Sequence, residues 1–192
     1  MISTASDEEL MVLVQAGNRD AFGTLFARYQ RSVWSWLARR TGDRELSSEL
    51  YQATSMRVWR PANTYTPGQP VKPWVFRIAS NLARDRFRRD RRQVDTIELE
   101  EELGADTFWR PEGHGQSIHP MSGHDLERLI LKLPDALREA FLLGAVEGLD
   151  HNELAEALDI TPANARRRVS RARARLRELM SEAGISAPKG VE

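Results

Sequence analysis

The chain has 192 residues, of which 41% are hydrophobic and 29% charged, a composition typical of a globular protein with one large or two small domains. It contains no cysteine, which excludes disulfides, thiol redox sensing and cysteine-ligated zinc. Apolar runs fall short of the roughly 18 residues of a transmembrane helix, and the N-terminal MISTASDEEL lacks a signal-peptide pattern, so we expect a cytoplasmic location.

The charges are segregated along the chain, although the formal net charge is zero. Residues 1–93 carry 16 Lys and Arg against 9 Asp and Glu, whereas residues 94–123 carry one arginine against seven acids. Residues 124–181 carry ten of each sign. Local basic faces determine phosphate binding, so this neutral balance is compatible with a nucleic-acid partner.

Helical periodicity and capping signals predict three helices before residue 60. Residues 6–9 resemble a capped helix start, and residues 17–18 provide a stop followed by the next cap. A long core helix should end near residues 41–42, and a third should cover residues 43–60. Residues 61–73 are rich in proline and turn formers, which predicts a loop.

A fourth helix, predicted over residues 74–92, has a basic stripe beside its apolar face. The stripe consists of Arg77, Asn81, Arg84, Arg88 and Arg91. Tyr65 and Trp74 lie close to it in the sequence, and cations with neighbouring aromatics suit single-stranded nucleic acid. The alternative is a solvated face, because Asp85 and Asp90 can pair with arginines one turn away.

Residues 94–123 contain acids followed by Gly, Pro and His, which predicts a flexible acidic linker between two helical lobes. The spacings of His114, His119 and His124 match none of the common zinc patterns. We therefore expect neither a metal nor a cofactor.

The second lobe ends in a helix-turn-helix pattern. Helices are predicted over residues 125–133 and 134–146, followed by a short helix over residues 150–159. A turn of about four residues follows, and a helix with seven arginines is predicted over residues 161–180. A short helix, a turn and a basic helix are the signature of this DNA-binding motif.

The last helix combines an apolar seam with cationic faces. The seam consists of Ala165, Val169, Ala172, Leu176 and Leu179, at steps of four and three. Thr161 followed by Pro162 marks the helix start. A solvated charged face is the alternative, but the preceding turn and short helix favour DNA binding.

The predicted fold class is therefore all-α, with two small helical domains joined by a flexible acidic linker, the second domain containing the helix-turn-helix. The expected boundaries are residues 1–93, 94–123 and 124–181, with a tail over residues 182–192. No pairing of nucleophile and base and no glycine-rich phosphate loop occurs, so we do not expect an enzyme.

Five motifs in order resemble the extracytoplasmic-function (ECF) sigma factors, small initiation subunits of bacterial RNA polymerase. They are DAFGTLFARY (20–29), TGDRELSSELYQATSMRVWR (41–60), KPWVFRIASNLARDRFRR (72–89), LPDALREAFLLGAVEGL (133–149) and RARARLREL (171–179). The resemblance implies promoter-specific transcription initiation, with core RNA polymerase and promoter DNA, both duplex and single-stranded, as partners. It also implies control by an anti-sigma factor that clamps between the lobes.

The resemblance implies a polymerase-docking helix over residues 43–60, which would contact the clamp helices of the largest subunit. The implied docking residues are Glu49, Gln52, Arg57 and Trp59. Ala53 stands where the family usually has an acid, and Ser55 where a large apolar residue is common.

The two DNA sites follow from the same resemblance. Tyr65, Trp74, Arg77, Asn81, Arg84 and Arg88 are implied for the -10 element, with Asn81 at the position of the base-capturing pocket. Asn164, Arg166, Arg167, Arg168, Ser170, Arg171, Arg173 and Arg175 are implied for the -35 element. Within the second set, Arg168, Arg173 and Arg175 are expected to contact phosphate or solvent and the others to read bases.

Two other functions are compatible with the residues alone. A stand-alone helix-turn-helix regulator would bind duplex DNA without polymerase, but would leave residues 43–91 without a role. A polymerase-binding decoy would dock without initiating, and Ala53 and Ser55 mildly favour it.

Overall fold

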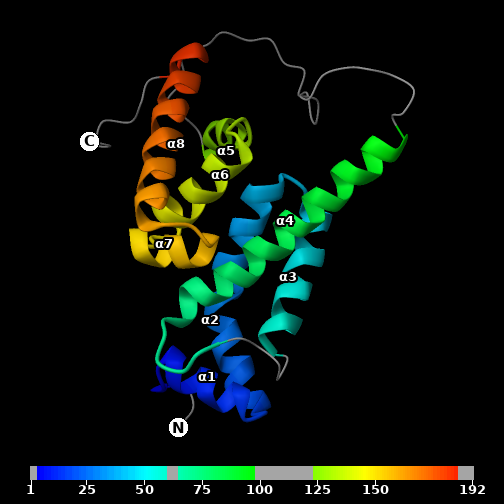
Figure 1. The fold of residues 1–192 in the computed structure, drawn as a ribbon, viewed down its shortest axis with the longest axis vertical. Helices are drawn as coiled ribbons and strands as arrows, with labels where there is room; N and C mark the ends of the chain where they lie inside the picture. Colours follow the sequence, from blue (N-terminus) through cyan, green and yellow to red (C-terminus); the bar gives the residue numbers. More distant parts are fainter. Residues whose placement is uncertain (1–3, 60–64, 98–122, 186–192) are drawn as a thin grey trace.

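The computed structural model describes residues 4–59, 65–97 and 123–185, which form helices and turns with no strand among them (Figure 1). Up to residue 97 the helices are α1 (Asp7–Gln15), α2 (Arg19–Thr41), α3 (Arg44–Trp59) and α4 (Val71–Ile97). From residue 123 they are α5 (Gly123–Leu131), α6 (Asp135–Phe141), the π-helical turn η2 (Leu142–Val146), α7 (His151–Leu158) and α8 (Pro162–Glu182). The all-α prediction is confirmed. In these ranges no helix has the length and apolarity that a bilayer span needs.

The first two helices begin and end where the capping signals predicted. The Ser6 hydroxyl accepts from the Glu9 amide, and the Glu9 carboxylate accepts from the Ser6 amide at 2.8 Å, which completes a capping box. The Asn18 side chain caps α2 by accepting from the Ala21 amide. Gly42 ends α2 in the left-handed conformation at φ 69°, where a side chain would be strained.

Helix α4 is longer at both ends than the sequence predicted. It begins at Val71 and includes Pro73, which is tolerated in the first turn because its missing amide has no intrahelical partner there. At its other end it continues to Ile97, into the segment predicted as linker. Residues 98–122, which contain His114 and His119, lie outside the described residues.

The first lobe is a four-helix arrangement around an aromatic and aliphatic core. Trp36 of α2 is fully buried and meets Phe76 of α4 edge to face, with ring centroids 5.9 Å apart. Near the start of α2, the ring centroids of Phe22 and Trp59 of α3 are 5.1 Å apart. Because α2 packs against α1, α3 and α4, it is the central helix of this lobe.

The second lobe packs α8 against α6 and α7. All five residues of the predicted α8 seam are buried: Ala165, Val169, Ala172, Leu176 and Leu179. Gly144 of η2 permits the close approach, because a Cβ there would lie 3.1 Å from Val169 Cγ2 and 3.4 Å from Leu154 Cδ2. Asp150 and Glu153 form the predicted capping box at the start of α7.

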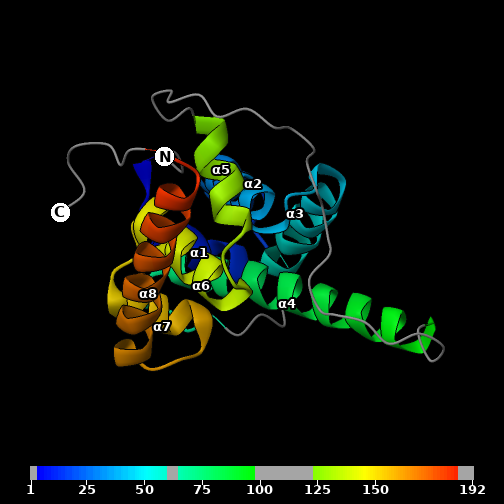
Figure 2. The same ribbon diagram turned by 90° about the horizontal axis from the view of Figure 1, so that it is seen from above.

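The two lobes lie against each other. Helix α7 packs on α4, while α5 and η2 contact α2 (Figures 1 and 2). The outer half of α4 projects beyond α2 and α3 in both views. No pattern in the sequence predicted this contact between the lobes.

Candidate nucleic-acid interface

Helix α8 presents cations outward because its opposite face is fixed in the core of the second lobe. Its first turn is ordered by Thr161, whose hydroxyl accepts from the Asn164 amide at 3.3 Å. Arg166, Arg167, Ser170, Arg171 and Arg173 are exposed, while Asn164, Arg168 and Arg175 are half-buried. All eight predicted -35 residues therefore lie on this helix, five of them on its open surface.

Three members of that set have local partners. The Asn164 carbonyl accepts from Arg167 Nη2 at 3.4 Å, so the two side chains lie together at the start of α8. Arg175 Nη1 donates to Glu178 at 3.0 Å and to Glu182 at 3.2 Å. The hydrogen bond to Glu178 is the main cause of the raised pKa of Arg175. Helix α8 continues to Glu182, beyond the predicted end at residue 180, and this adds a second carboxylate partner for Arg175.

The stripe on α4 has a different environment from the face of α8. Asn81 is exposed, and Arg88 is exposed with Nη2 3.1 Å from Asp85. Arg77 Nη2 lies 3.9 Å from Asp159, at the end of α7. Arg84 is half-buried and donates through Nη2 to Ser80 at 2.9 Å. Arg77 and Arg84 thus lie beside acidic residues of the second lobe, whereas Asn81 and Arg88 remain exposed.

Tyr65 and Trp74 pack together at the start of α4. Their ring centroids are 5.4 Å apart in an edge-to-face arrangement, and the side chains are only 4% and 5% exposed. The Tyr65 hydroxyl donates to the Gln69 carbonyl at 2.7 Å, and burial raises the pKa of Tyr65. The sequence placed both rings beside the stripe to stack on bases, whereas in this structure they hold the loop onto α4.

The predicted docking residues line α3. Glu49, Gln52 and Arg57 are exposed, and Trp59 is half-buried against Phe22. The sequence analysis missed Met56, which is 56% exposed and follows Gln52 by four residues. Helical spacing puts Glu49, Gln52 and Met56 on one face. The sequence signal that could have identified Met56 is its spacing of four from Gln52, which separates it from the buried face of Leu50, Thr54 and Val58.

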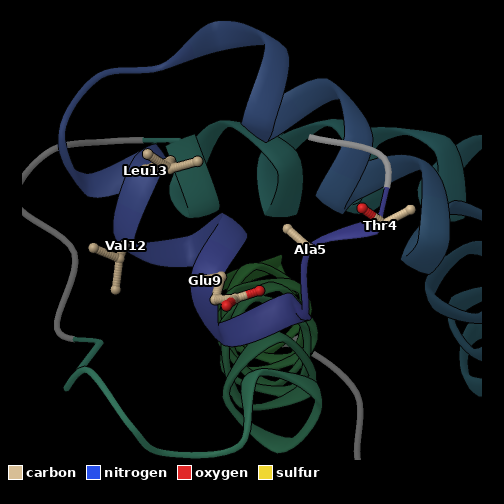
Figure 3. Close-up of a pocket in the computed structure, with 5 residues that line it drawn as sticks. All are labelled: Thr4, Ala5, Glu9, Val12 and Leu13. Carbon is tan, nitrogen blue, oxygen red and sulfur yellow. The ribbon is translucent and has the colours of Figure 1, made fainter. Parts of the chain in front are cut away.

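Two surface depressions in the parts that the structure describes are open to solvent and not enclosed. A shallow open depression beside α1 is lined by Thr4, Ala5, Glu9, Val12 and Leu13 (Figure 3). The Glu9 carboxylate that faces it is already engaged in the α1 capping box. Over the described ranges no cluster of three His, Asp or Glu side chains is arranged to hold a metal.

Comparisons with known proteins give the family. The sigma-70 region 2 family matches residues 25–93, and sigma-70 region 4 matches residues 123–176. RNA polymerase sigma factor CarQ of Myxococcus xanthus is 37% identical over 166 residues, covering 86% of this chain and 92% of CarQ. The ECF RNA polymerase sigma-E factor of Haemophilus influenzae is 26% identical, covering 90% of this chain and 94% of the relative.

The chain belongs to the sigma-70 family as an ECF sigma factor. A solved structure of CnrH in complex with the cytosolic domain of CnrY is similar in fold, with a TM-score of 0.67 and 27% identity. The similarity covers 92% of this chain and 97% of that one. The region 2 match contains the predicted docking and -10 residues of this ECF sigma factor, and the region 4 match contains the predicted -35 residues.

Proposed function

We propose that this ECF sigma factor directs promoter-specific initiation by RNA polymerase, with α8 reading the -35 duplex and α4 holding -10 DNA. The observation that carries the proposal is the exposed cluster at the start of α8, on the second helix of a helix-turn-helix. Such helices insert their N-terminal residues into the major groove. The buried seam of α8 keeps this cluster outward.

At the -35 element, the exposed arginines supply the specific contacts. An arginine reads guanine through two hydrogen bonds to O6 and N7, each pair worth about 1–3 kcal/mol of discrimination. Arg166, Arg167 and Arg171 are exposed and take this role, and Ser170 lies among them. Asn164 assists chiefly by its contact with Arg167. Arg168 and Arg173 contact phosphates, while Arg175 contributes least because Glu178 and Glu182 hold it.

At the -10 element, α4 supplies an amide and cations to an unpaired strand. Removing a base from the stack costs a few kcal/mol, which contacts to the flipped base must offset. Exposed Asn81 provides hydrogen bonds for such a base, and Arg88 contacts the backbone. Tyr65 and Trp74 act by fixing the loop that leads into α4.

Docking on core polymerase uses the outer face of α3. Glu49 and Gln52 supply polar contacts there, and exposed Met56 adds a flexible apolar contact on the same face. Arg57 and half-buried Trp59 flank them toward the end of the helix. Ala53 is half-buried rather than presented outward, so the missing family acid is a smaller loss than the sequence suggested.

We also place this factor in the cytoplasm under the control of an anti-sigma protein. The structural relative CnrH is solved bound to the cytosolic domain of another protein, CnrY, which supports regulation by a protein partner. Two helical lobes that meet along α4 and α7 offer a boundary at which such a partner can bind.

Reconstituted transcription tests the proposal. Core polymerase with this protein should initiate at discrete sites in a library of genomic fragments, whereas core polymerase alone should not. Folded protein that yields no specific start on any fragment would refute the sigma function. Tight operator binding by the free protein would instead favour a stand-alone regulator, and co-purification with polymerase without open complexes would favour a decoy.

A further inference from the structure

Helix α1 is fixed to the first lobe along one face and at its N-terminal end. Three of its apolar residues are buried: Leu10, Met11 and Val14. Asp7 Oδ1 lies 2.6 Å from Arg28 Nη1 of α2, and the Tyr29 hydroxyl donates to the same carboxylate. Arg28 Nη2 also donates to the Ala5 carbonyl at 2.9 Å. These contacts give α1 a fixed position on α2.

The same helix contacts both ends of residues 65–71, which lead into α4 and which we call the entry segment. At one end, Gln15 Nε2 donates to the Tyr65 carbonyl at 2.9 Å. At the other end, where α1 lies beside the start of α4, Glu8 Oε1 accepts from the Val71 amide at 3.4 Å (Figure 1). Gln15 is half-buried and Tyr65 is buried, so water competes less for the first of these hydrogen bonds.

The internal bonds of the entry segment form a turn. The Tyr65 hydroxyl donates to the Gln69 carbonyl at 2.7 Å, and the Gln69 amide donates to the carbonyl three residues earlier at 3.2 Å. Gly68 in this turn has a φ of 88°, which a residue with a side chain rarely adopts. Residues 66–70 are exposed, so the position of the turn relative to α4 depends on the packing of Tyr65 against Trp74 and on the two contacts with α1.

A strand of DNA that runs along α4 from Asn81 toward the helix start reaches the entry segment. Asn81 stands ten positions after Val71, about 15 Å along the helix axis. A segment already held in its bound shape loses less conformational entropy on binding than one that the ligand must order. Residues that fix the entry segment therefore raise the affinity for the strand without touching it.

We propose that Gln15, assisted by Glu8, is a positioning residue for -10 recognition, because it holds the entry segment ready for the unpaired strand. The consequence for DNA rests on the function proposed above, whereas the hold on the segment does not. The sigma-70 region 2 match begins at residue 25, so neither residue lies in the matched part of the chain.

Hydrogen exchange in the free, full-length protein measures the hold on the entry segment. Gln15→Glu keeps the shape of the side chain but replaces its N–H donor with a carboxylate oxygen, which repels the Tyr65 carbonyl. The amides of Gln69 and Val71 should then exchange about tenfold faster. Gln15→Lys keeps an N–H donor and should restore most of the protection. Gln30→Glu makes the same chemical change at an exposed position of α2 and should leave these amides unchanged.

Two DNA probes separate positioning from a general loss of structure. One is a duplex fragment with the -35 element, and the other is a single strand with the -10 sequence, both from a promoter located by its transcript start. Holoenzyme with Gln15→Glu should bind the single strand about tenfold more weakly, while its affinity for the duplex should change less than about twofold. Gln15→Lys should restore the single-strand affinity. Glu8→Ala should lower it by less than Gln15→Glu does, because the Glu8 bond is longer.

The outcomes distinguish this proposal from the sigma function. Unchanged exchange at Gln69 and Val71 in folded Gln15→Glu would overturn the positioning role, and so would faster exchange with unchanged single-strand affinity. Equal losses on both probes would overturn it as well, since they would reduce Gln15 to a structural residue. If the variants release the entry segment but wild-type holoenzyme gives no specific initiation, the hold on the segment stands and the sigma function fails. Circular dichroism shows whether each variant is folded, and Glu8→Ala tests the same hold should Gln15→Glu unfold.

Discussion

Helices α4 and α8 show how similar sequence patterns lead to different surfaces. Both are long, rich in arginine and buried along one apolar face. The arginines of α8 that face away from the core are exposed or paired within their own helix. On α4, Arg77 and Arg84 face residues of the second lobe, and Arg88 faces solvent. Periodicity identifies a cationic face, but the tertiary partner decides how much of it is available.

The two helices also begin differently. Helix α8 is capped by Thr161, the residue next to its first turn. Helix α4 receives a distant cap, because the Val71 amide donates to Glu8 Oε1 of α1 at 3.4 Å, across 63 residues. A local cap is readable from the sequence, whereas a distant one depends on the packing of α1 against α4.

The largest expected effect comes from placing a charge in the α8 seam. Ala172 is fully buried, so Ala172→Glu forces a carboxylate into the core of the second lobe. We expect the free energy of unfolding of that lobe to fall by about 4 kcal/mol or more. Thermal unfolding followed by circular dichroism measures the loss, and the -35 surface should disappear with it.

Ala163→Glu is the matched control on the same helix. Ala163 is exposed in the first turn, where a negative charge interacts favourably with the helix dipole. Its stability should stay within about 0.5 kcal/mol of wild type. Equal losses in both variants would contradict the assignment of one buried and one open face to α8.

A second comparison distinguishes the arginines of α8 that read bases from those that contact phosphate or pair with acids. Arg171→Ala should lower promoter affinity of the reconstituted holoenzyme by about 1–3 kcal/mol and change the preferred -35 sequence. Arg173→Ala should weaken binding about uniformly across sequences, and Arg175→Ala should have the smallest effect, because Glu178 and Glu182 already hold Arg175. Competition between promoter libraries measures all three. A uniform loss from Arg171→Ala would contradict the base-reading role.

Local chemistry explains why much of the fold was predictable. The capping boxes at Ser6 and Asp150, the left-handed Gly42 and the start at Thr161 all depend on residues within one turn. The α8 seam follows from helical spacing alone. For the candidate site, sequence placed the eight -35 residues on one helix, and the structure agrees with that placement.

What could not be predicted depends on contacts between distant segments. The rings of Tyr65 and Trp74 were expected beside the stripe, but their burial follows from the packing of the loop on α1 and α4, where Gln15 Nε2 donates to the Tyr65 carbonyl at 2.9 Å. The close approach of α8 to Gly144 in the π-helical turn η2 is likewise a contact between separate segments. Arg40 and Glu139 look like ordinary surface charges in the sequence, because their partners are on the other lobe.

A smaller effect is expected from the outer end of the α4 stripe. Arg88→Ala should lower promoter affinity of the holoenzyme about fivefold on all sequences and reduce the slope of log affinity against log salt by about 1. Arg86→Ala is the control, since Arg86 is half-buried and is not part of the stripe. Titrations at several salt concentrations measure both slopes. Identical slopes for Arg88→Ala and wild type would show that Arg88 contacts no phosphate.

The smallest effects are expected from substitutions that remove the caps at the starts of α8 and α4. Thr161→Ala removes the side-chain acceptor of the Asn164 amide and should lower the free energy of unfolding of the second lobe by about 1 kcal/mol. Thr161→Ser keeps the acceptor and should restore most of that loss. Glu8→Ala removes the longer bond to Val71 and should cost the first lobe less, about 0.5 kcal/mol. Chemical denaturation of each variant measures these differences. If Glu8→Ala lowered the free energy of unfolding more than Thr161→Ala, the stability of α4 would depend more on its cap than that of α8 does.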